Sequence, residues 1–135
     1  MMKYISCLLI LFIAGCASMS NQQMMDTLNE TTRNYGDAIR WNYFELANNF
    51  RKEPDGSRQE TDFSALKKLR VTAYEVLNRS LSDNHIQAGQ TVEIKFYRMS
   101  DMIEKTIIDR QDWQYDINDK KWYLHSSLPN FGQNN

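Results

Sequence analysis

The chain has few of the residues that build disulfides, backbone cradles or a strong electric field. Two cysteines, five glycines and two prolines occur in 135 residues, and 16 basic residues nearly balance 17 acidic ones. Because the net charge is only −1, the chain lacks the basic patch that nucleic-acid binding requires and the excess positive charge that attracts an anionic bilayer. It also contains neither a phosphate-binding loop nor a dinucleotide fingerprint. We therefore expect no nucleic-acid partner and no bound nucleotide.

The sequence also lacks a recognisable metal site and an activated nucleophile. His85 and His125 are far apart in the chain and neither has a cysteine beside it, so they form no ligand cluster. No Gly-x-Ser-x-Gly elbow is present. We therefore expect no metal, no cofactor and no enzymatic activity.

What the sequence does contain is a strongly apolar N-terminus. Lys3 precedes an apolar stretch from Tyr4 to Ala14, which is shorter than the ~20 residues that span a bilayer. Such a basic start and apolar run are typical of a secretory signal peptide. Residues 1–15 are therefore expected to be removed, which leaves Cys16 as the one remaining cysteine and excludes a disulfide.

The residues Ile13-Ala14-Gly15-Cys16 end this segment. An aliphatic residue, two small residues and a cysteine in this order resemble the lipobox of bacterial lipoproteins. The resemblance implies a diacylglycerol on the Cys16 thiol and an acyl chain on its amine. Because Ala17 stands where an aspartate would imply retention at the inner membrane, the resemblance further implies a lipid anchor in the outer membrane, with the protein on its periplasmic face.

Two other interpretations of the N-terminus remain open. Ordinary signal peptidase could cleave after a small-x-small pattern such as Gly15-Cys16-Ala17 and release a soluble protein. An apolar N-terminus could also occur by chance in a cytoplasmic protein.

On the lipobox interpretation, residues 16–27 form the lipidated cysteine and a flexible tether.

The next segment predicts two helices. Leu28, Tyr35, Ile39, Leu46 and Phe50 recur at helical spacing, but Trp41 and Phe44 fall outside the shared apolar face. A break near residues 40–42 would let both pack, and Asn42 followed by Glu45 predicts a second helix cap there. We expect helices at about residues 27–40 and 43–52.

Period-two alternation begins near Leu69 and predicts four antiparallel strands connected as a meander. The alternation slips near Glu75, which indicates a bulge, and is clearest from Val92 to Phe96. The last two strands lie around residues 107–115 and 122–124. Since a sheet with one apolar face needs a cover, the two helices are expected to pack on it.

This order of elements resembles the cystatin-like roll of nuclear transport factor 2-like and ketosteroid isomerase-like domains. The phrase Tyr35-x-x-Ala-Ile-Arg-Trp41 and the aromatic pattern from Gln111 to Phe131 also resemble a group of uncharacterised proteobacterial lipoproteins. Together these resemblances imply one α+β domain over residues 28–131, followed by a polar tail at 132–135. They leave open a homodimer that pairs through its sheets.

Three functions fit these observations. The first is a non-enzymatic lipoprotein that binds or scaffolds another envelope protein. The second is a binder of an apolar ligand or lipid inside the roll. The third, implied by the ketosteroid isomerase-like resemblance, is a proton-transfer enzyme that uses a carboxylate such as Asp109 with a tyrosine such as Tyr35. Alternatively, Asp109 forms a structural ion pair with Arg40 or another basic residue at the rim of the sheet. The candidate pocket consists of Tyr35, Trp41, Asp109, Trp113, Tyr115 and Trp122.

Overall fold

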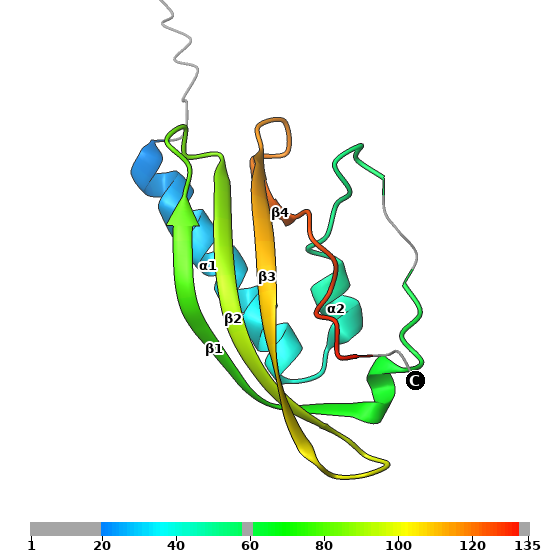
Figure 1. Cartoon of the computed structure of the whole chain (residues 1–135). Helices are drawn as coiled ribbons and strands as arrows, with labels where there is room; N and C mark the ends of the chain where they lie inside the picture. Colours follow the sequence, from blue (N-terminus) through cyan, green and yellow to red (C-terminus); the bar gives the residue numbers. More distant parts are fainter. Residues whose placement is uncertain (1–19, 58–60, 133–135) are drawn as a thin grey trace, which may run out of the picture.

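The computed structural model describes residues 20–57 and 61–132 and has two helices packed on a four-stranded antiparallel sheet (Figure 1). The predicted α+β class and the order of elements are therefore confirmed. Residues 1–15 and Cys16, on which the signal peptide and lipidation were predicted, lie outside the described residues. No helix within the described ranges is long and apolar enough to cross a bilayer.

The first helix, α1 (Asn21–Arg40), begins earlier than the predicted residue 27. Ser20 and Gln23 form a capping box, in which the Ser20 hydroxyl accepts from the Gln23 backbone N–H and the Gln23 side chain accepts from the Ser20 backbone N–H. Met24 is buried and lies one turn before Leu28 on the same apolar stripe. Residues 21–27 are therefore helical, and the prediction that they form a flexible tether is wrong.

The break after α1 occurs where it was predicted, but for a different reason. Asn42 has a left-handed backbone (φ 64°), which asparagine tolerates better than most residues. Its side-chain carbonyl accepts a hydrogen bond of 2.8 Å from the backbone N–H of Val71 and so fastens the break to the sheet. Asn42 is thus not a helix cap, since Tyr43 precedes the second helix and makes no side-chain capping bond.

The second helix, α2 (Phe44–Asn48), is shorter than the predicted span of 43–52. The backbone of residues 50–52 pairs instead with the last strand, because Phe50 accepts from the Leu124 N–H at 2.8 Å and Lys52 donates to the Leu124 carbonyl at 3.0 Å. This pairing holds the chain extended and ends the helical region early. A short 3₁₀ helix, η1 (Leu66–Lys68), then leads into the sheet.

The sheet is a simple meander whose neighbours in space are neighbours in sequence. Its strands are β1 (Leu69–Leu81), β2 (Gln87–Arg98), β3 (Glu104–Asp116) and β4 (Lys121–Leu124). The β1–β2 register shifts after Val71 and again after Val76, and the second shift confirms the bulge expected near Glu75. The β2–β3 register runs without interruption.

The core lies between α1, α2 and one face of the sheet. Alternate residues of β2 and β3 point inward, from Ala88 to Phe96 and from Asp109 to Trp113. Gly36 lets α1 approach β1 closely, because a Cβ atom at this position would lie 2.7 Å from the Tyr74 ring. A glycine is thus required where helix and sheet meet.

The segment after β4 completes the core beside α2. The Phe131 ring packs edge-on against Phe44 and Phe96, with centroid distances of 5.7 and 4.9 Å. Arg98 Nη2 donates to the Phe131 carbonyl at 2.6 Å. Phe131 is therefore part of the packed core.

Candidate functional site

The aromatic residues predicted to line a pocket mostly fill the core. Tyr35 and Trp113 are fully buried and pack edge-on, with ring centroids 5.3 Å apart. Trp122 is also buried, and its Nε1 donates to the Met24 carbonyl at 3.2 Å. Tyr35 thus packs α1 on β3, and Trp122 bonds β4 to the first turn of α1, so these side chains stabilise the fold.

The other two predicted aromatics lie elsewhere. Trp41 is 60% exposed at the end of α1 and does not reach the interior. Tyr115 is partly buried, 5.5 Å from the Trp122 ring. It lines a polar surface cavity of about 260 Å³ beside Lys52 and Asp116. None of the three cavities described for this domain is lined by all six predicted residues, and the exposed Trp41 lies apart from the buried Tyr35 and Trp113.

Asp109 does point inward, as predicted, and belongs to a buried polar network. Gln111 Nε2 donates to Asp109 Oδ2 at 2.9 Å and to the Tyr74 hydroxyl at 3.0 Å. The Gln111 side-chain carbonyl accepts from Trp113 Nε1 and from Gln90 Nε2, both at 3.1 Å. One glutamine side chain thus satisfies polar groups from three strands, as buried polar groups require.

Among residues 20–57 and 61–132, no cation forms an ion pair with Asp109. Arg40 Nη1 donates to the Val71 carbonyl at 2.9 Å, and its guanidinium stacks on Trp41 at 4.7 Å from the ring centroid. Burial raises the pKa of the Asp109 carboxyl, while the bond from Gln111 partly offsets this effect. A buried carboxyl that pairs with a glutamine, and with no cation of the described residues, therefore lies in the core.

The Tyr35 hydroxyl is buried and has no hydrogen-bond partner among the described residues. Its burial, reinforced by the nearby Asp109 charge, raises the pKa of Tyr35 well above the ordinary value, so this phenol stays protonated. A protonated tyrosine near a carboxyl is the residue pair that the proton-transfer hypothesis requires. However, neither residue lines any of the three cavities described for this domain.

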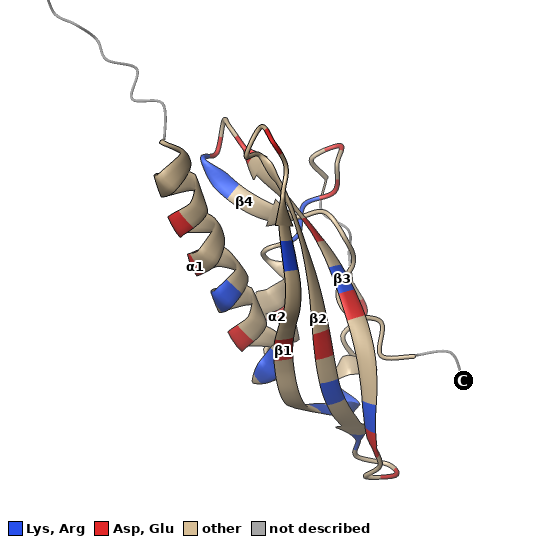
Figure 2. Cartoon of the chain, turned by 60° about the vertical axis from the view of Figure 1, so that its left-hand side comes forward, with Lys and Arg blue, Asp and Glu red and all other residues tan. Residues whose placement is uncertain are grey.

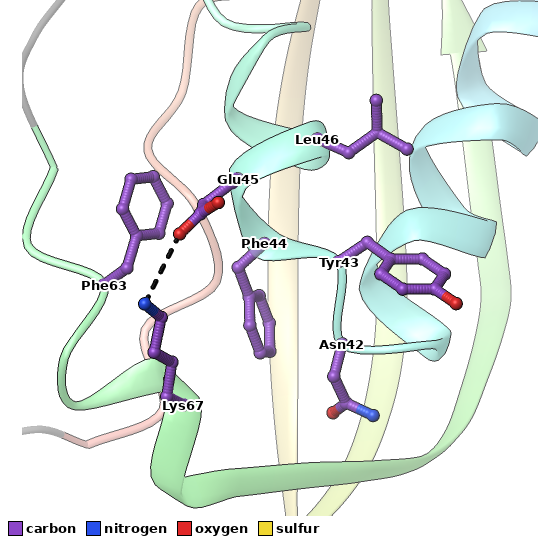
Figure 3. Close-up of a pocket in the computed structure, with 7 residues that line it drawn as sticks. All are labelled: Asn42, Tyr43, Phe44, Glu45, Leu46, Phe63 and Lys67. Atoms are coloured by element: carbon purple, nitrogen blue, oxygen red, sulfur yellow. Dashed lines mark ion pairs between the residues drawn. The ribbon is translucent and has the colours of Figure 1, made fainter.

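The largest of these cavities is a groove of about 480 Å³ beside α2, hereafter the α2 groove (Figure 3). Phe44 is buried and forms its floor, while Phe63 lies across from α2 on the segment that leads to η1. Glu45 and Lys67 face each other over the groove, with Lys67 Nζ 3.6 Å from Glu45 Oε1. The residues that line the groove are Asn42, Tyr43, Phe44, Glu45, Leu46, Phe63 and Lys67.

The rim of the α2 groove exposes large apolar side chains. Tyr43 is 62% exposed and Leu46 is 51% exposed, and Trp41 lies just before them in the chain. Aromatic residues of this kind are enriched among the residues that dominate protein–protein binding energy. An apolar groove with an exposed ion pair at its rim is therefore suited to binding a side chain.

The remaining cavity described for this domain lies between α1 and β1 and measures about 250 Å³. Its lining is more polar than that of the α2 groove and includes three arginines. Elsewhere, basic and acidic residues are interspersed over α1 and the sheet, as Figure 2 shows. Among residues 20–57 and 61–132, no group of three His, Cys, Asp or Glu side chains is arranged to hold a metal ion.

No protein-family model matches the chain, and no curated protein matches its sequence. The class that the structure defines is an α+β domain with two helices on one face of an antiparallel meander.

Sequence reasoning missed the residues that form the α2 groove. Leu46 was expected on the inward apolar face of the helices, Tyr43 was assigned no contact, and Phe63 lies in a polar stretch. An isolated phenylalanine within a polar segment was the available signal, because such a residue needs an apolar neighbour. Its partner on α2 was not predictable, since it depends on where α2 ends.

Proposed function

We propose that this protein is a lipoprotein of the outer membrane whose periplasmic domain binds another envelope protein without catalysing a reaction. The lipobox-like residues ending at Cys16 support the anchor, and the helix-and-meander order supports the cystatin-like roll. The signal peptide of residues 1–15 is part of the same proposal. The observation that carries the binding function is the α2 groove with its exposed aromatic rim.

The position of the α2 groove supports a partner that approaches from the periplasm. The groove begins at Asn42, two residues beyond the C-terminal end of α1. Because α1 has 20 residues, its axis is about 30 Å long. A lipid at Cys16 would hold the first turn of α1 near the membrane. The groove would then face away from the bilayer, where a soluble or peptidoglycan-associated protein can reach it.

The lining of the groove indicates what the partner presents. The floor and far wall, Phe44 and Phe63, fit an aliphatic or aromatic side chain. The side chains of Glu45 and Lys67 are 69% and 71% exposed, respectively. Their ion pair can therefore open towards charged groups of the partner. The partner segment therefore combines an apolar anchor residue with flanking charges.

Photo-crosslinking in intact cells tests this function. A benzoylphenylalanine at position 43 should capture one defined envelope protein, and the additional change Leu46→Asp should abolish the adduct. Because Leu46 is 51% exposed, a charge there disrupts an interface while changing the stability of the free domain by less than about 0.5 kcal/mol.

The matched control is Ile117→Asp, since Ile117 is 69% exposed in the β3–β4 turn, away from the groove. This variant should leave the adduct unchanged. The proposal is wrong if no adduct forms at position 43, or if the adduct survives Leu46→Asp.

A further inference from the structure

We propose that the cavity between α1 and β1 is a binding site for a phosphate group. This site is separate from the α2 groove and is not required by the binding function proposed above. Three arginines, Arg33, Arg40 and Arg79, line a cavity of about 250 Å³ together with one acidic residue, Asp37. The charged side chains of the lining therefore sum to about +2. A phosphate monoester, which carries about −1.5 to −2, would nearly neutralise this charge.

The three arginines are not neutralised by the protein. None of them forms an ion pair within the described parts of the chain, and Asp37 forms none either. A guanidinium carries five N–H donors, and the hydrogen bonds of Arg40 use one of them. Arg33 makes no hydrogen bond to any described residue. Donors on both side chains are therefore available to an anion.

Arg79 is held in place by neutral acceptors. Its Nε atom donates to Gln90 Oε1 at 3.0 Å, and its Nη2 atom donates to the same oxygen at 2.7 Å. Nη2 also donates to the Thr32 hydroxyl at 3.0 Å, and Nη1 donates to Asn29 Oδ1. These bonds fix the orientation of the guanidinium and leave its positive charge intact. Arg79 therefore supplies a preorganised charge, while Arg33 and Arg40 supply the free donors.

The size and charge of the cavity favour phosphate over a carboxylate. A carboxylate carries a single negative charge, whereas a phosphate monoester carries about −1.5 to −2 at neutral pH and offers three acceptor oxygens. Arginine binds phosphate through two parallel N–H···O bonds. The volume of about 250 Å³ also accommodates a short organic stem, so the group can belong to a lipid headgroup or to a small free molecule.

Calorimetric titration of the full chain in neutral detergent micelles tests this site. Inorganic phosphate and glycerol phosphate are the free probes, and phosphatidic acid mixed into the micelles is the lipid probe, with phosphatidylcholine as its control. We expect saturable binding of one phosphate per chain. Binding of the free probes identifies a soluble source, whereas binding of phosphatidic acid alone identifies a headgroup.

Arg33→Gln should weaken this binding at least tenfold, and Arg40→Gln should do the same. Arg33→Gln is the cleaner test because Arg33 holds no other part of the fold. Arg110→Gln is the matched control, since Arg110 is exposed on β3 and does not line the cavity. The proposal is overturned if neither the free probes nor phosphatidic acid bind, or if Arg33→Gln and Arg110→Gln bind phosphate equally well.

Discussion

At the residue scale, the least expected feature is a carboxyl in the core that has no counter-ion among the residues that the structure describes. Asp109 is 8% exposed, and its Oδ2 accepts a hydrogen bond of 2.9 Å from Gln111 Nε2. Removing an ionised carboxylate from water is unfavourable unless a charge or several donors compensate. The folded protein therefore favours the protonated form of Asp109 more than the unfolded chain does.

Asp109→Asn should stabilise the protein at neutral pH. Because burial raises the pKa of Asp109 in the folded state, its contribution to stability is full below the unfolded pKa of about 3.9 and is lost as the pH rises through the folded value. The asparagine variant does not titrate and keeps the bond from Gln111. Its melting temperature should exceed that of the wild type near pH 7, and the difference should shrink as the pH falls towards about 3.5.

The control is Asp112→Asn, which exchanges an exposed carboxylate on the same strand. It should leave the melting temperature nearly unchanged at both pH values. If Asp109→Asn instead destabilises the domain at neutral pH, the ionised carboxylate stabilises the folded state and the predicted cost of its burial is wrong.

The inward position of Asp109 followed from the period-two pattern of its strand, which places it on the same face as Trp113. Its actual partner did not follow from the sequence. Gln111 lies two residues away on the same face, and whether Asp109 pairs with Gln111 or Arg40 depends on the distance between α1 and the sheet. Residue spacing within one strand determines a face, but it does not determine contacts between elements.

At the element scale, the packing of α1 on β1 depends on a single small residue. Gly36 is buried, and the Tyr74 ring that lies over it is held by a hydrogen bond from Gln111. Since the ring cannot withdraw without losing this bond, close approach of helix and strand is coupled to the buried polar network.

Gly36→Ala should destabilise the domain by a net amount of about 1 kcal/mol. The added methyl group would lie 2.7 Å from Tyr74 Cε1, and overpacking of this kind costs about 1–3 kcal/mol. The better helix propensity of alanine offsets roughly 0.5–1 kcal/mol of that cost. Urea unfolding measures the net change.

Asn34→Ala is the matched control, because Asn34 is exposed on the same helix. It should be neutral or slightly stabilising, in line with the helix propensity of alanine. Equal stability of the Gly36→Ala variant and the wild type would mean that α1 can move away from β1 at little cost.

The helix boundaries show how far local sequence signals reach. The capping box of Ser20 and Gln23 is visible in the sequence and marks the true start of α1, although the apolar pattern alone places the start near residue 27. The end of α2 has no such local signal. It is set by pairing of residues 50–52 with Leu124, more than seventy residues away, which no local pattern reports.

At the scale of the whole molecule, the two ends of α1 have different surroundings. Its first turn lies at the end of the sheet opposite the β2–β3 hairpin (Figure 1). Its last turn leads into the α2 groove and contributes Arg40 to the α1–β1 cavity. A protein anchored before α1 would therefore present its groove at a distance from the membrane.

The α+β architecture was predictable because the period changes from helical to alternating at one point in the chain and stays alternating. The candidate site was not, because large aromatic residues carry the same sequence signal whether they fill a core or border a pocket. Trp113 and Trp41 illustrate this, since one is fully buried and the other is 60% exposed.

The central claim is that the domain is held at a membrane by lipid on Cys16. Intact mass spectrometry of the protein purified from bacterial membranes, beside a Cys16→Ala variant, tests this claim most directly. We predict a mature chain that begins at Cys16 and carries the mass of a diacylglycerol and an acyl chain, whereas the variant carries neither. A wild-type chain that begins at another residue and carries no lipid would contradict the claim.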